Sequence, residues 1–192
     1  MLETATTIEV VDDRSDQVGS APPRSGTRQG WPRWAAILGV AALAVPVVAV
    51  TIVALTQTWL PPSDHALIEI RTMDVGGSST PLLGSYSRLG WNHPGPLEFW
   101  LLALPYRLFG GTTKGMLVGA IAINVAAIVG CLAVAWRRGG TILTLIVGVA
   151  LAALVRGHGA AFLFHIWNPD LPAFPTALLI LATWAVIEGD MA

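Results

Sequence analysis

Charged side chains are scarce in this chain. Aspartate, glutamate, lysine and arginine make up 12% of its 192 residues, whereas hydrophobic residues make up 54%. Soluble globular domains carry about 25% charged residues. The composition therefore predicts an integral membrane protein. The formal net charge of −1 provides no basic surface field, so a nucleic-acid partner is not expected.

The chain also lacks the residue patterns of several common catalytic sites. Its single cysteine, Cys131, lies in an apolar run, which excludes an internal disulfide and a thiolate metal cluster. No GxSxG, HExxH, Walker A or Rossmann glycine pattern is present. His158 and His165 are seven residues apart, but Gly157 and Gly159 interrupt the helix that would align them. The residues themselves therefore predict no hydrolase, nucleotide or metal site.

Long apolar stretches are abundant, and they predict an all-α, polytopic membrane fold with about four transmembrane helices. The first stretch holds about 24 uncharged residues, enough to cross the roughly 30 Å hydrocarbon core of a bilayer. The expected spans are residues 35–58, 115–136, 141–155 and 173–187. Arg137-Arg138-Gly139-Gly140 is expected to form a tight turn between the second and third spans. The GxxxG spacing of Gly115 and Gly119 indicates close helix packing.

The flanking residues set the expected orientation. Residues 1–33 are rich in charge, proline and glycine, which predicts a disordered cytoplasmic tail before a transmembrane domain over residues 34–192. Arg24, Arg28 and Arg33 directly precede the first span, so the N-terminus is expected in the cytoplasm. We therefore expect a multi-pass protein of the plasma membrane.

Residues 59–114 are expected to form an external loop that begins with a short helix. A Pro-Pro pair ends the first span, because proline cannot continue a helix. Ser63 or Asp64 then offers an N-cap for a helix that would run to Met73.

A second short helix is expected over residues 96–110. This segment is apolar over about half the length that a spanning helix needs, and Arg107 would be costly at mid-bilayer. We favour a helix at the outer interface. The alternative, that the segment spans, stays open because the basic residues divide too evenly between the two sides. The favoured topology places Asp64, His93, His158, His165 and Asp170 outside and Arg137-Arg138 in the cytoplasm.

The polar stretch of residues 84–96 lies between apolar blocks and holds candidates for ligand binding. Tyr86, Asn92 and His93 have no core of their own to fill, so contacts with a ligand at the membrane surface are expected. The prolines beside His93 would fix the direction of its ring. A structural histidine bonded to a backbone carbonyl is the open alternative.

Arginines in and beside the loop are candidates for phosphate binding. Arg71, Arg88 and Arg107 carry planar, always charged groups that suit a phosphate. Pairing with nearby carboxylates, or contact with lipid headgroups, is the structural alternative.

Asp64 is the candidate catalytic residue. A carboxylate at the outer mouth of a transmembrane helix can accept the proton of an acceptor hydroxyl. A helix cap or a solvated loop charge is the structural alternative. Glu69 and Asp74 follow at intervals of five residues, so the three carboxylates do not share one helix face and form no metal cage.

Several short segments together resemble the N-terminal part of a glycosyltransferase family. They are Asp64 after the first span, Gly84-Ser85-Tyr86-Ser87-Arg88, His93-Pro94-Gly95-Pro96, Arg107-Leu108-Phe109-Gly110 and Trp167-Asn168-Pro169. The order is similar to the protein mannosyltransferase and aminoarabinose transferase branch of the GT-C glycosyltransferases, where a His-Pro-Pro segment stands in place of His93-Pro94-Gly95. The last segment resembles one in actinobacterial membrane proteins of this type. His65 follows Asp64 where the family often has a second acid.

The resemblance implies that Asp64 matches the family's catalytic carboxylate. On this hypothesis a sugar passes from a polyprenyl-phosphate donor to an extracytoplasmic acceptor, Arg88 and Arg107 neutralise the departing phosphate, and His93 positions the site. A divalent metal ion bound by Asp64 stays open as a cofactor. Family members have nine or more spans, so a second chain that completes the fold is an expected partner, besides membrane lipid. Whether the chain is active alone stays open.

Two functions of other classes compete with this one. The first is a non-catalytic membrane scaffold or envelope assembly subunit whose external loop binds a partner. The second, a small transporter, is less favoured because the charged residues cluster in loops rather than at mid-bilayer.

Overall fold

The computed structural model describes residues 33–56, 58–87 and 89–189, with side chains from residue 45 onward. Its elements are α1 (Arg33–Thr56), α2 (Asp64–Asp74), β1 (Tyr86–Ser87), β2 (Trp91–Asn92), α3 (Leu97–Leu108), α4 (Thr113–His158), the 3-10 helix η1 (Ala160–Leu163) and α5 (Ala173–Ile187). The expected mostly helical fold is confirmed. A small antiparallel hairpin of β1 and β2 was not expected. The prediction of a disordered tail concerns residues that, except for Arg33, lie outside the described ranges.

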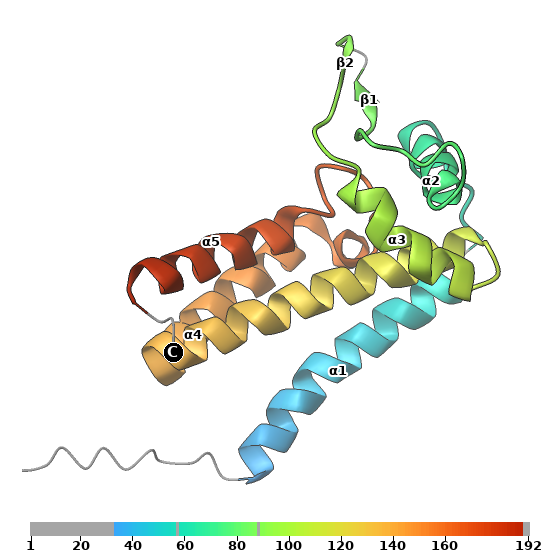
Figure 1. Cartoon of the computed structure of the whole chain (residues 1–192). Helices are drawn as coiled ribbons and strands as arrows, with labels where there is room; N and C mark the ends of the chain where they lie inside the picture. The colour runs from blue at the N-terminus through green and yellow to red at the C-terminus, as the bar shows by residue number, and fades with distance from the viewer. Residues whose placement is uncertain (1–32, 57, 88, 190–192) are drawn as a thin grey trace, which may run out of the picture.

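The long helices pack side by side and the short elements gather at one end. Figure 1 shows α4 between α5 and α1, in agreement with the contacts that α4 makes with both. The same figure shows α2, α3 and the hairpin together at the end where α1 finishes and α4 begins. Residues from the first loop and from the segment before α5 therefore meet at this end.

Helix α4 folds back on itself at Gly140. This residue has φ 57° and ψ −145°, a backbone conformation that is not helical and that glycine adopts without steric cost. A Cβ atom on Gly148 would lie 3.7 Å from Leu132, which is possible only if the two legs of α4 run side by side. The expected turn after Arg137-Arg138 is therefore confirmed.

The expectation of four membrane spans is not supported. Among the described residues, only α4 is both long and apolar enough to cross a membrane, judged by length and composition. The segment Val45–Thr56 of α1 and the whole of α5 are shorter apolar helices. The two stretches expected as spans over residues 115–136 and 141–155 are the legs of this single folded helix.

Helix α3 crosses the first turns of α4 at very short range. With 12 residues, α3 is about 18 Å long, well short of the hydrocarbon core. A Cβ atom on Gly115 would lie 2.6 Å from the carbonyl oxygen of Pro105, and one on Gly119 would lie 2.6 Å from Cγ of the same proline. The close packing expected from the GxxxG spacing is confirmed, and its partner is α3.

The buried core at the loop end, which is the end that carries α2, α3 and the hairpin, joins three helices. Ile68 of α2, Phe99 and Leu102 of α3 and Met116 of α4 are almost completely buried. Burial of each large apolar side chain contributes about 1.5–3 kcal/mol relative to exposure. The core therefore fixes α2 against α3 and α4, and with α2 it fixes the position of Asp64.

Candidate functional site

A polar cleft of about 540 Å³ lies at the loop end of the molecule. Its wall comes from three segments that are far apart in the sequence: the start of α2, the β1–β2 hairpin and the loop before α5. The lining residues are Ser63, Asp64, Leu67, Ser85, Tyr86, Ser87, His93, Trp167, Asn168 and Pro169. The structure therefore brings Asp64, Tyr86 and His93 into one site, as the sequence hypothesis required.

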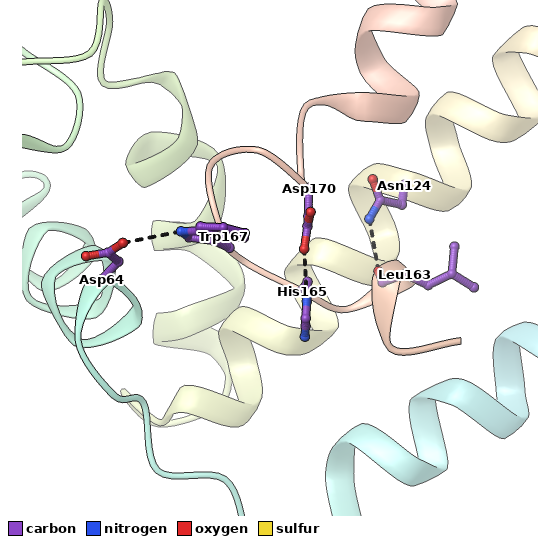
Figure 2. A network of polar contacts seen from close by, with 6 residues as sticks. All are labelled: Asp64, Asn124, Leu163, His165, Trp167 and Asp170. Atoms are coloured by element: carbon purple, nitrogen blue, oxygen red, sulfur yellow. Dashed lines mark hydrogen bonds and ion pairs between the residues drawn. The ribbon is translucent and has the colours of Figure 1, made fainter. Parts of the chain in front are cut away.

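Asp64 is held at the first residue of α2. Trp167 donates its indole N–H to Oδ2 of Asp64 at 3.3 Å, and Figure 2 shows the two side chains pointing toward each other. Ser63 donates more weakly to Oδ1, at 3.4 Å. Ser63 is the N-cap residue of α2, one of the two candidates from the sequence, but its side chain makes no capping hydrogen bond. The Asp64 carboxylate thus lies in the first turn of α2 and accepts hydrogen bonds from Trp167 and Ser63.

His93 is positioned by main-chain hydrogen bonds that extend the hairpin. Its backbone N–H donates to the Ser85 carbonyl at 2.9 Å, and its carbonyl accepts from the Gly84 N–H at 2.9 Å. A Cβ atom on Gly84 would lie 2.7 Å from the His93 carbonyl oxygen, so glycine is required for this approach. The imidazole packs against the Trp91 ring with centroids 4.6 Å apart. The hairpin therefore fixes the backbone at His93, and the Trp91 ring contacts its imidazole.

The other candidates lie elsewhere. Asn92 pairs with Tyr86 in the hairpin but faces a separate small cavity beside Arg71. Arg107 donates a hydrogen bond to the Val75 carbonyl and is absent from the walls of the cleft. Arg88 lies outside the described residues. Arg107 and Asn92 therefore do not line the cleft that contains Asp64.

A histidine–carboxylate pair beside the cleft was missed from the sequence. His165 Nδ1 lies 2.7 Å from Oδ2 of Asp170, and Figure 2 shows the pair on the same loop as Trp167. The His65 ring lies 6.2 Å from that of His165, centroid to centroid. The spacing of five residues between His165 and Asp170 was visible in the sequence. Without helix or strand periodicity, however, nothing indicated that they face each other.

A second cavity, called here the Glu98 chamber, adjoins the cleft. It measures about 300 Å³ and is lined by Gly84, Ser85, His93, Pro94, Gly95, Leu97, Glu98, Leu101, Ile123, Asn168, Leu171, Pro172 and Pro175. Ser85, His93 and Asn168 belong to the walls of both cavities. Burial raises the pKa of Glu98 to about 8. The uncharged form of Glu98 therefore predominates at pH 7, a feature that its position two residues after Pro96 did not indicate.

The donor set does not form a metal centre. Within the described ranges, no three side chains of histidine, cysteine, aspartate or glutamate are grouped closely enough to hold a metal ion. Asp64 is the one carboxylate in the described wall of the cleft. Among the described residues, therefore, the divalent metal ion left open by the sequence finds no group of three such ligands.

Comparisons with protein-family models, with curated proteins and with solved structures found no match to this chain.

Proposed function

We propose that this chain is part of a membrane glycosyltransferase of the GT-C type, which transfers a sugar from a polyprenyl-phosphate donor to an acceptor outside the plasma membrane. The observation that carries this proposal is the cleft in which Asp64, Tyr86 and His93 converge from separate segments. A fold that needed these residues only as helix cap and loop surface would not require them to face one cavity.

The cleft supplies the parts that such a transfer needs. Asp64 accepts the proton of the acceptor hydroxyl, whose oxygen forms a bond to the anomeric carbon of the sugar. The bond from that carbon to the phosphate oxygen breaks, and its electron pair leaves with polyprenyl phosphate. The Trp167 N–H holds the Asp64 carboxylate in place, and His93 with the hydroxyl group of Tyr86 offers hydrogen bonds to the substrates.

The departing phosphate also needs positive charge or hydrogen-bond donors. Arg88 follows Ser87 of the cleft wall in the chain, and we keep it as the proposed phosphate ligand. Arg107 is no longer favoured for this role because its guanidinium is bonded to the Val75 carbonyl.

The membrane is proposed to surround α1, α4 and α5. α1 has 24 residues and is about 36 Å long, and the second leg of α4, residues 141–158, is about 27 Å long. α5 has 15 residues, about 22 Å, so it would need a locally thinner bilayer or flanking loop residues to complete its crossing. On this arrangement the N-terminus is cytoplasmic and the cleft faces outward.

Two measurements test the proposal. Purified chain in lipid nanodiscs should bind polyprenyl phosphate, detected by native mass spectrometry. Membranes that contain the chain, supplied with a radiolabelled polyprenyl-phosphate sugar, should transfer label to an extracytoplasmic acceptor. Asp64→Asn should lower that transfer about 100-fold or more, because it removes the general base, and should leave lipid binding intact.

The matched control is Asp74→Asn, which removes a carboxylate at the other end of the same helix, outside the cleft wall. It should leave transfer unchanged. A wild-type chain that neither binds polyprenyl phosphate nor transfers sugar would contradict the proposal, and so would full transfer by Asp64→Asn.

One observation favours the scaffold function as a second candidate. Leu60, Leu82 and Leu89 of the external loop expose 81%, 75% and 79% of their surface. A contiguous apolar patch is typical of a protein-docking surface, and the scaffold function requires these three leucines to form one. If the scaffold function holds, substitution of these leucines abolishes the effect of the chain in cells, whereas Asp64→Asn does not abolish it.

A further inference from the structure

The Glu98 chamber combines an apolar wall with polar groups that have no protein partner. Leucine, isoleucine and proline side chains make up most of the wall. Three polar side chains in it, Ser85, Glu98 and Asn168, each carry a buried oxygen with no hydrogen-bond partner among the described residues. Leaving a buried polar atom unpaired costs about 1–3 kcal/mol. The three oxygens are covered in the free structure, so a ligand in the cavity completes their hydrogen bonds only once these side chains turn toward it.

The chemistry of the wall selects the class of ligand. No lysine or arginine among the described residues lines the chamber, so no such side chain there balances the negative charge of a phosphate or carboxylate. A serine hydroxyl and an asparagine amide each offer both donor and acceptor atoms, and so does an uncharged carboxyl. Small cavities with mostly apolar walls and a few placed polar groups are typical binding sites for neutral organic molecules.

The chamber also lies next to the place where chemistry is proposed to occur. Ser85, His93 and Asn168 separate it from the cleft that contains Asp64, and all three line both spaces. Movement of these side chains on binding would therefore let one end of a ligand reach the cleft.

We propose that the Glu98 chamber is a subsite for a neutral, hydroxyl-bearing ring, a sugar, which is hydrogen-bonded by Glu98, Asn168 and Ser85. The inference rests on the proposed function and deepens it: the sugar of the donor occupies the chamber, and its anomeric carbon faces Asp64. Glu98 is a binding residue on this proposal, and it neither accepts nor delivers a proton in the transfer.

The protonation state of Glu98 predicts that sugar binding depends on pH. Because burial raises the pKa of Glu98 to about 8, the uncharged carboxyl predominates below pH 8 and the carboxylate above it. Sugar binding should therefore be strongest below pH 8 and fall about tenfold between pH 7 and pH 9. His93 is the other titratable side chain in the described wall. α2 also packs on α3, but its Glu69 meets Thr113 and Tyr106 at the far end of α3.

The test uses the full chain in lipid nanodiscs and three soluble probes: methyl glucopyranoside, methyl mannopyranoside and methyl arabinofuranoside. Saturation-transfer NMR detects weak binding of such sugars without interference from the lipid. At least one probe should show saturation transfer, and empty nanodiscs should show none. Glu98→Leu and Ser85→Ala should each weaken binding at least fivefold.

Glu98→Gln is the decisive variant, because it keeps the size and a neutral amide with donor and acceptor atoms. It should bind the probe within about twofold of wild type at pH 7 and, unlike wild type, should keep that affinity at pH 9. Glu188→Gln, at an exposed position after α5, is the control and should follow the wild-type pH profile. Thermal unfolding of each variant shows whether it has folded.

The outcomes separate this inference from the proposed function. If none of the three probes binds, or if a folded Glu98→Leu binds as wild type does, the subsite is wrong, even where polyprenyl phosphate still binds. If a sugar probe binds in a Glu98-dependent way while polyprenyl phosphate does not, the subsite stands and the glycosyltransferase proposal fails. Loss of binding in Glu98→Gln at pH 7 would also overturn the inference, since it would show that the carboxyl acts in its charged form.

Discussion

At the scale of single residues, the site depends on a glycine that carries no chemistry. Gly84 lets the chain pass so close to His93 and Gly95 that an added Cβ would lie 2.7 Å and 2.9 Å from their carbonyl oxygens. Backbone atoms cannot turn aside as a flexible side chain can. Any larger residue at this position must therefore move the hairpin, and with it the wall that the cleft and the Glu98 chamber share.

Gly84→Ala is accordingly expected to weaken polyprenyl-phosphate binding about tenfold or more, measured by native mass spectrometry in nanodiscs. Gly157→Ala is the matched control, because a Cβ there would meet no atom within 4 Å. It should bind as wild type does. Normal binding by Gly84→Ala would show that the position of His93 does not matter for the ligand.

Residue types indicated part of this site and left part hidden. Asp64 and His93 could be chosen from the sequence because polar side chains between apolar blocks need a reason to be there. Glu98 and Trp167 could not be chosen in the same way. The raised pKa of Glu98 arises from burial that only the packed structure creates, and the hydrogen bond from Trp167 to Asp64 joins residues 103 positions apart in the chain.

At the scale of elements, the crossing of α3 over α4 holds the loop end together. Gly119→Ala would place a Cβ atom 2.6 Å from the rigid ring of Pro105, so α3 must shift away from α4. Overpacking of this kind costs about 1–3 kcal/mol. We expect a thermal midpoint several degrees below wild type, measured by tryptophan fluorescence in nanodiscs, together with weaker polyprenyl-phosphate binding.

Gly148→Ala provides the comparison within the same helix. Its Cβ would lie 3.7 Å from Leu132, an ordinary contact, so the thermal midpoint should change little. Equal midpoints for the two variants would show that the α3–α4 crossing does not limit stability.

The elements themselves were largely predictable, and their lengths explain why. α2 was expected from residue 64 to Met73 and is observed as Asp64–Asp74, because prolines before it and glycines after it mark both ends. The turn at Gly140 was equally clear from two arginines and two glycines between apolar runs. The β1–β2 hairpin has strands of only two residues, too short for an alternating pattern to show in the sequence.

At the scale of the whole molecule, the structure separates two ends that the proposed function places on opposite sides of a membrane. Figure 1 shows the turn between the two legs of α4 and the start of α1 away from the end that carries α2 and the hairpin. Ser79 lies in the loop at the cleft end and Thr141 lies beside the turn, and both are exposed. Their accessibility in intact cells therefore reports the orientation of the whole chain.

Cysteines introduced by Ser79→Cys and Thr141→Cys, each in a Cys131→Ala background, test this orientation with a membrane-impermeant maleimide. Cys131 is replaced because a native thiol would obscure the signal, although it is completely buried. Ser79→Cys should be labelled in intact cells and Thr141→Cys only after permeabilisation, because in the proposed arrangement the first leg of α4 lies between them and crosses the bilayer. The reverse pattern would place the cleft in the cytoplasm, where an extracytoplasmic acceptor cannot reach Asp64. Labelling of both from outside would mean that the folded α4 does not cross the membrane. This result would contradict the proposed arrangement of the chain in the membrane.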